Sequence, residues 1–100
     1  MKKLTLLGLF CSLATFTNGY AADIEAGKET AAICAGCHGV DGQAMNPEWP
    51  NLAGQNAKYI EIQLRSFQNG NRKNDMMTPM AQSLNAESVA NVAAYYNSLK

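Results

Sequence analysis

The sequence predicts an all-α domain of about three helices. Apolar residues recur at helical spacing in three stretches, at about 23–34, 56–68 and 86–99. Turn-forming glycine, proline and asparagine residues lie between these stretches. No stretch alternates apolar and polar residues in the way that a half-buried strand does. Together these observations favour a small helical fold without a sheet.

Residues 1–21 are expected to be a cleaved secretory signal peptide. Two lysines give the segment a positive start, a mostly apolar run follows over residues 4–16, and small residues close it. We place the cleavage after Ala21 and, as the second choice, after Ala22. The alternative is a retained membrane anchor, but the apolar run is short for a membrane span. Cys11 lies in the run and is expected to be removed with it.

Residues 22–100 are then a single domain of 79 residues. The leader holds two of the eight Lys and Arg residues, so six remain against eight Asp and Glu, which gives a formal charge of −2. No basic cluster suggests nucleic acid as a partner, and no apolar run remains that would cross a membrane. A domain of this size rarely buries enough apolar surface to be stable, so we expect a further support such as a cofactor.

The first helix is expected to begin at Asp23, which would cap it, and to reach Cys34 or beyond. Three other residues on one stripe, at helical spacing, support it: Ile24, Gly27 and Ala31. The structural interpretation of this stripe is ordinary core packing.

The second and third helices are expected over about 56–68 and 86–99. The second has a buried face of Ile60, Leu64 and Phe67, a solvated face of Lys58, Glu61 and Arg65, and a stop at Gly70. The third follows Asn85 as its N-cap, and its buried side holds Val89, Val92, Tyr95, Tyr96 and Leu99.

The stretch CAGCH carries two of the three cysteines and the only histidine. Cys-x-x-Cys-His is typical of covalent c-type haem attachment. Two thiols three residues apart on a helical turn reach the two vinyl groups of a haem, and the adjacent histidine binds the iron. We therefore assign Cys34 and Cys37 to the attachment of haem c and His38 to the iron.

Three other interpretations of CAGCH were considered. A thioredoxin-like redox pair would need a βαβ setting, and no strand pattern is present. A zinc site would need four ligands, and only three Cys and His residues remain after the leader. A disulfide between Cys34 and Cys37 would close a very small loop and stabilise little.

The chain resembles a known family at this point, the class I cytochromes c, and within it the small bacterial monohaem proteins of the c4, c5 and c553 types. The resemblance covers essentially residues 22–100. It rests on four segments in order: AGKETAAICAGCHGVDG, PNLAGQNAKYI, GNRKNDMMTPMAQSL and ANVAAYYNSL. It implies a class I cytochrome c fold, in which about three helices wrap around one covalently attached haem.

The resemblance also implies roles for single residues. The carbonyl of Pro50, twelve residues after His38, would accept a hydrogen bond from the imidazole Nδ1. Leu52 would pack against the haem. Where the first and last helices cross, Gly27 would allow a close approach, with Val92 and Tyr95 pressing against it.

The second axial ligand must be something other than histidine, because His38 is the only one. Met45 lies too few residues after His38 to return to the iron from the opposite face. The loop expected before the third helix holds three methionines, Met76, Met77 and Met80. The family places this ligand eight residues before the N-cap of the last helix, which selects Met77 and leaves Met80 and then Met76 as alternatives.

The predicted function is a periplasmic single-electron carrier with a His/Met-ligated haem, and not an enzyme. It would shuttle electrons between a respiratory quinol-oxidising complex and a terminal oxidase or reductase. Its partners would be redox proteins met transiently, including membrane complexes approached from the periphery, and the chain would be a monomer. Two alternatives stay open: a haem-based ligand-binding protein, and a haem subunit of a larger redox enzyme.

Overall fold

The structure is a computed structural model and describes Lys3, Gly8 and residues 21–100. The predicted signal peptide therefore lies almost entirely outside the described residues and stays a prediction. The described chain forms five helices, which are α1 (Ile24–Ala31), α2 (Ala35–His38), α3 (Ala57–Asn69), α4 (Met77–Gln82) and α5 (Ala86–Ser98). No strand occurs within residues 21–100. The prediction of an all-α fold is confirmed.

The three long helices begin at or next to the residues that the sequence indicated as their starts. Asp23 accepts a hydrogen bond from the Ala26 amide at 3.1 Å. Asn56 caps α3 through the Tyr59 amide, and Asn85 forms a reciprocal capping box with Ser88 at the start of α5. Each side chain satisfies an amide that has no partner inside its helix. Gly70 ends α3 in the left-handed conformation, as its position predicted.

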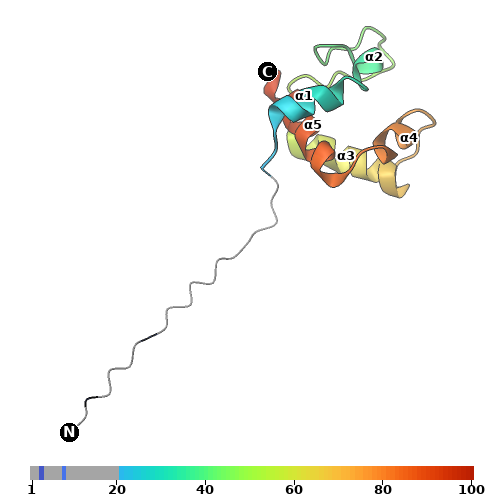
Figure 1. The fold of residues 1–100 in the computed structure, drawn as a ribbon. Helices are drawn as coiled ribbons and strands as arrows, with labels where there is room; N and C mark the ends of the chain where they lie inside the picture. Colours follow the sequence, from blue (N-terminus) through green and yellow to red (C-terminus); the bar gives the residue numbers. More distant parts are fainter. Residues whose placement is uncertain (1–2, 4–7, 9–20) are drawn as a thin grey trace.

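The first and last helices, α1 and α5, pack across each other (Figure 1), and Gly27 lies at their contact. A Cβ atom built at this position would lie 2.0 Å from the Asn91 carbonyl oxygen and 2.9 Å from the Tyr95 Cβ. The predicted close approach and its Tyr95 contact are therefore confirmed, and the atoms nearest to Gly27 belong to the Asn91 backbone, which the prediction did not name. The buried side chain of Asn91 also accepts a hydrogen bond from the Asp23 amide at 2.8 Å, which ties the start of α1 to α5.

Gly27→Ala is expected to lower the stability of the holoprotein by about 3 kcal/mol. The added methyl group meets a backbone carbonyl, which cannot rotate away as a side chain would, so the helices must separate. Thermal unfolding followed by circular dichroism should show a midpoint about 10–20 °C lower. Gly36→Ala is the matched control, because a Cβ there meets no atom within 4 Å. Equal midpoints for the two variants would contradict the close crossing.

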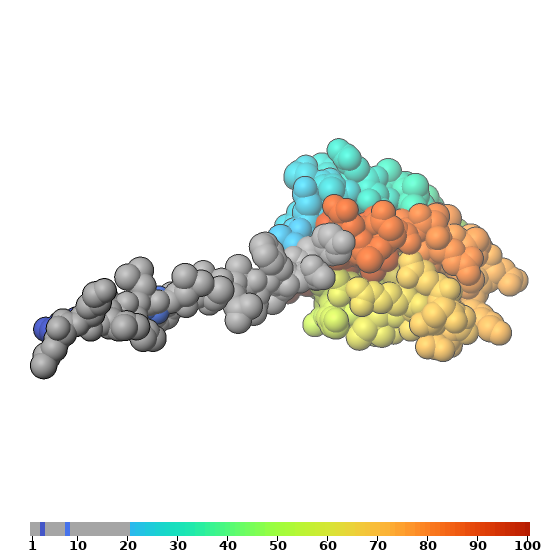
Figure 2. All heavy atoms as spheres, turned by 60° about the horizontal axis from the view of Figure 1, so that its bottom comes forward, coloured from blue at the N-terminus to red at the C-terminus, as the bar shows by residue number. Residues whose placement is uncertain are grey.

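The core lies mainly between α5 and its neighbours. α1 packs against α5, and α3 packs against both α5 and α4. Figure 2 shows α5, in orange to red, between the cyan segment of α1 and the yellow segment of α3. The main buried cluster consists of Ala31, Ile60, Val92, Ala93, Tyr95 and Tyr96. The faces predicted for the second and third helices are therefore confirmed, with Phe67 and Val89 buried as well.

Two short helices modify the predicted arrangement of about three. The first helix ends at Ala31 instead of reaching Cys34, and turn residues separate it from α2. The methionine segment, expected as a loop, forms α4 from Met77. Pro79 is compatible with this helix because it occupies the first turn, where an amide has no intrahelical partner to lose. Figure 1 shows α2 with its following loop, and α4, as two lobes projecting from the same side of the long helices.

Candidate haem site

The turn of α2 carries both thiols and the imidazole of the CAGCH motif. The amides of Cys37 and His38 donate to the Cys34 carbonyl at 3.2 and 2.9 Å, so the segment is wound as a helix from its first cysteine. Gly39 ends the helix at a φ of 86°, and a Cβ atom there would lie 2.0 Å from the Gln43 carbonyl oxygen. The motif is thus held on one rigid turn, and the chain leaves it through a position that favours glycine.

The imidazole of His38 is buried and has a defined partner. Its Nδ1 lies 2.8 Å from the carbonyl oxygen of Pro50, the contact that the resemblance implied. A carbonyl oxygen only accepts, so Nδ1 must carry the proton. The lone pair therefore resides on Nε2. A histidine in this tautomer can bind a metal through Nε2 while Nδ1 keeps its hydrogen bond.

The loop after α2 holds the Pro50 carbonyl in place. The amides of Leu52 and Ala53 both donate to the Gly42 carbonyl, at 2.7 and 3.0 Å. The side chain of Asn51 accepts a hydrogen bond from the Ala44 amide at 2.7 Å. These three hydrogen bonds connect residues 42 and 44 with residues 51–53. They therefore hold the residues directly after Pro50 in place. Leu52 is partly buried against the main core cluster.

Cys34 and Cys37 are free, half-buried thiols, with no disulfide between them. Burial, as the main cause, raises the pKa of the Cys34 thiol above its ordinary value. Within the described residues, no three side chains of His, Cys, Asp or Glu come together in a way that would hold a metal ion. The motif thus offers one imidazole and two thiols but no zinc-type cluster.

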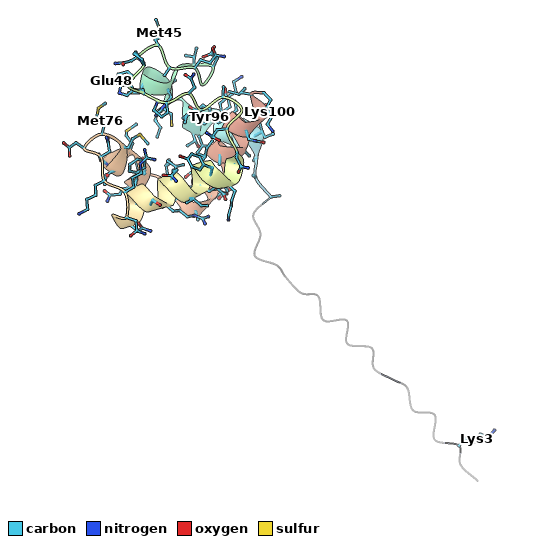
Figure 3. The ribbon with its side chains drawn as sticks, turned by 180° about the vertical axis from the view of Figure 1, so that it is seen from behind. Lys3, Met45, Glu48, Met76, Tyr96 and Lys100 are labelled. Carbon is cyan, nitrogen blue, oxygen red and sulfur yellow. The ribbon has the colours of Figure 1, made fainter. Side chains whose placement is uncertain are left out.

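The four methionines of the domain differ in exposure. Met45 is 99% exposed, Met76 55% and Met80 38%, whereas Met77 is half-buried at the first position of α4. Figure 3 shows Met45 on the lobe that follows α2 and Met76 on the lobe of α4. Met77 is therefore the least exposed of the three candidates before α5. Its role as an iron ligand stays a prediction.

Tyr96 is a site residue that the sequence pattern assigned to the core alone. It is 2% exposed, and its hydroxyl has no hydrogen-bond partner within the described part of the chain. Burial and the neighbouring Cys34 thiol raise the pKa of the Tyr96 phenol, so the phenol stays protonated and able to donate. A buried hydroxyl without a partner costs about 1–3 kcal/mol. The hydroxyl thus lies beside the Cys34 thiol, where a group bound to that cysteine would meet it.

A Cys-x-x-Cys-His turn with an anchored imidazole, in a small all-α domain, defines a protein of the c-type haem class. The sequence profile of the family described as "Cytochrome c" matches residues 24–100. The chain belongs to this family and is a class I cytochrome c close to the c4 type. Members of this family bind haem c covalently, and the chain is an electron-transfer protein and not an enzyme.

Three relatives illustrate the range of the family. Cytochrome c-554(548) of Halomonas halodenitrificans is 46% identical over 81 residues, which cover 78% of this chain and 98% of the relative. The crystal structure of reduced cytochrome c4 from Pseudomonas stutzeri superposes with a TM-score of 0.75 at 38% identity, covering 80% of this chain and 47% of that one. A thiosulfate dehydrogenase electron acceptor of Thiomonas intermedia is 43% identical over 79% of this chain and 37% of the relative. The chain thus spans about half the length of the c4 protein or less, but nearly all of the Halomonas protein.

Proposed function

We propose that the chain is a periplasmic single-electron carrier with one haem attached through Cys34 and Cys37 and ligated by His38 and Met77. It shuttles electrons between a respiratory quinol-oxidising complex and a terminal oxidase or reductase, as a monomer that meets its partners transiently. Export through the signal peptide of residues 1–21 delivers it to the periplasm. The haem, when bound, supplies the reversible one-electron chemistry.

The contact between His38 and Pro50 is the observation that carries this proposal. It keeps the proton on Nδ1 and holds the ring in one orientation, so that Nε2 is available without a change in the fold. An iron ligand that does not move between the two redox states keeps the reorganisation energy of electron transfer small. Met77 is half-buried on the other lobe, and as the second ligand of the iron it would leave no open position for a substrate.

The defining test is a potentiometric titration of the purified holoprotein together with absorption spectroscopy. A single one-electron transition and the weak far-red band of methionine-ligated ferric haem are expected. The amount of iron per chain should correspond to one haem. A high-spin ferric spectrum that changes on adding cyanide or CO would instead favour a ligand-binding protein.

A haem subunit of a larger redox enzyme is the second candidate. It is favoured by the likeness to the Thiomonas thiosulfate dehydrogenase electron acceptor, a longer protein. Gel filtration of a periplasmic extract distinguishes the two. A free carrier elutes near the size of the mature chain, whereas a subunit elutes with its enzyme.

The electron-transfer rate with a redox partner is expected to depend only modestly on salt. The apolar or small candidates for the docking surface are Ala35, Gly36, Ala44, Thr78 and Met80. Nearby charges are of both signs, with Arg72, Lys73 and Asp75 on one lobe and Asp41 and Glu48 on the other. Attraction and repulsion then largely cancel, so a tenfold rise in ionic strength should change the second-order rate constant by less than about threefold. A steep fall measured by stopped flow would indicate a charged docking patch.

A further inference from the structure

The segment of residues 74–78, directly around Met77, is closed by four hydrogen bonds. The Asn74 side-chain oxygen accepts from the amides of Met76 and Met77, each at 2.9 Å. The Asn74 carbonyl accepts from the Thr78 amide at 2.9 Å. The Thr78 hydroxyl accepts from the Asn74 amide at 3.0 Å. The side chain and the backbone of Asn74 thus form hydrogen bonds with the residue before Met77, with Met77 itself and with the residue after it.

Asn74 supplies what the start of α4 otherwise lacks. The residue at the N-cap position, Met76, makes no side-chain capping bond. The amides of a first helical turn have no partners inside the helix, and a side-chain oxygen is the usual substitute. Asn74 provides this oxygen from two residues upstream of the N-cap. It therefore sets where the helix begins and which residue stands at its first position.

The residue at which α4 begins matters because three methionines of this segment could serve as the ligand. Met76, Met77 and Met80 carry the same thioether on a long, flexible side chain, so their chemistry does not distinguish them. Only the backbone position of each residue decides which sulfur faces the opposite lobe. Met76 and Met80 are exposed, and Met77 is half-buried.

We propose that Asn74 is the positioning residue that selects Met77 over its two neighbours as the second axial ligand. This inference rests on the proposed function, in which a methionine of α4 binds the iron. Without the Asn74 side chain, two amides lose their acceptor and the first turn of α4 loosens. Met77 then leaves the iron more often, and Met76 or Met80 gains access to the vacated position.

Asn74→Ala in the ferric holoprotein is the test. External imidazole competes with the methionine, so its apparent affinity measures how often Met77 is released. We expect this affinity to rise about tenfold, which corresponds to about 1.4 kcal/mol. The far-red band should weaken, and proton NMR should show more than one iron-bound methionine methyl signal.

Two variants give the controls. Asn74→Asp keeps an acceptor oxygen at the same place and should restore the wild-type imidazole affinity and a single methyl signal. Asn69→Ala removes a comparable asparagine whose oxygen accepts only from the Asn71 amide, away from the methionines, and should behave as wild type. Thr78→Val removes the hydroxyl that accepts from the Asn74 amide. It should raise the imidazole affinity as Asn74→Ala does, but by less.

Equal imidazole affinities for Asn74→Ala and Asn69→Ala would overturn the inference, as would a failure of Asn74→Asp to restore the affinity. If Asn74→Ala does not fold with haem, the Thr78→Val result decides, and a wild-type affinity there overturns it. Failure of the proposed ligand is recognised separately. In that case Met77→Ala keeps the far-red band and Met80→Ala or Met76→Ala abolishes it, whatever the Asn74 variants do.

Discussion

Replacing Cys34 and Cys37 together by serine is expected to leave a largely unfolded chain. The buried core of the described domain is small, and only Tyr96, Val89 and Val92 are large side chains that are fully buried. Three of the nine buried hydrophobic residues are alanines. A domain of 79 residues with such a core depends on a bound group to supply apolar surface. Far-ultraviolet circular dichroism should show that most of the helical signal is lost.

The matched control is Cys11→Ser, which changes the same residue type in the segment expected to be removed on export. It should yield a mature protein that folds and carries haem as the wild type does. Adding free haem to the double variant should restore part of the helical signal, because His38 can still bind the iron and a ligand that binds the folded chain stabilises it. A cooperative, helical apoprotein would refute the dependence on haem.

Met77→Ala is expected to abolish the far-red band, lower the reduction potential and open the ferrous protein to CO. The thioether is the weak donor that raises the potential of a His-ligated haem, and its loss leaves one axial position for external ligands. The absorption spectrum should show that each ferrous haem of the variant binds one CO molecule. Absorption spectroscopy and a potentiometric titration of the same sample measure all three changes.

Met80→Ala and Met76→Ala serve as controls of the same residue type in the same segment. Both side chains are exposed, so their removal should leave the band, the potential and the closed iron nearly unchanged. If Met80→Ala instead abolishes the band, the ligand is Met80. An intact band in every single variant would mean that the methionines of this segment replace one another.

The starts of the long helices could be predicted from the sequence because they depend on local chemistry. A capping side chain bonds an amide two or three residues away, so Asp23, Asn56 and Asn85 indicate helix starts without knowledge of the fold. The attachment motif is local in the same sense, since CAGCH needs only one helical turn to bring its groups together. Asn74 carries a similar local signal, as an asparagine three residues before Met77, but the expectation of a loop there concealed it.

The short helix α4 and the role of Tyr96 depended on more distant contacts. Gln68 of α3 donates to the carbonyls of Ala81 and Leu84, at 2.8 and 3.0 Å, and so fixes the end of α4. A helix containing proline, six residues long, has little intrinsic tendency to form, and packing against α3 stabilises it. Tyr96 falls on an apolar stripe, and only the packed structure reveals that its hydroxyl ends beside Cys34 without a partner.

By itself, the sequence indicated the helical class, the starts of the helices and a motif typical of haem attachment, because periodicity, capping and the Cys-x-x-Cys-His spacing are properties of neighbouring residues. Only the tertiary structure decided that the Asn91 carbonyl meets Gly27, that the carbonyls of Ala81 and Leu84 meet the Gln68 side chain, and that the Tyr96 side chain packs beside Cys34. Two of these three contacts are made by backbone carbonyls. A carbonyl is the same in every residue, so no sequence pattern records it, and its position follows only from how the whole chain packs.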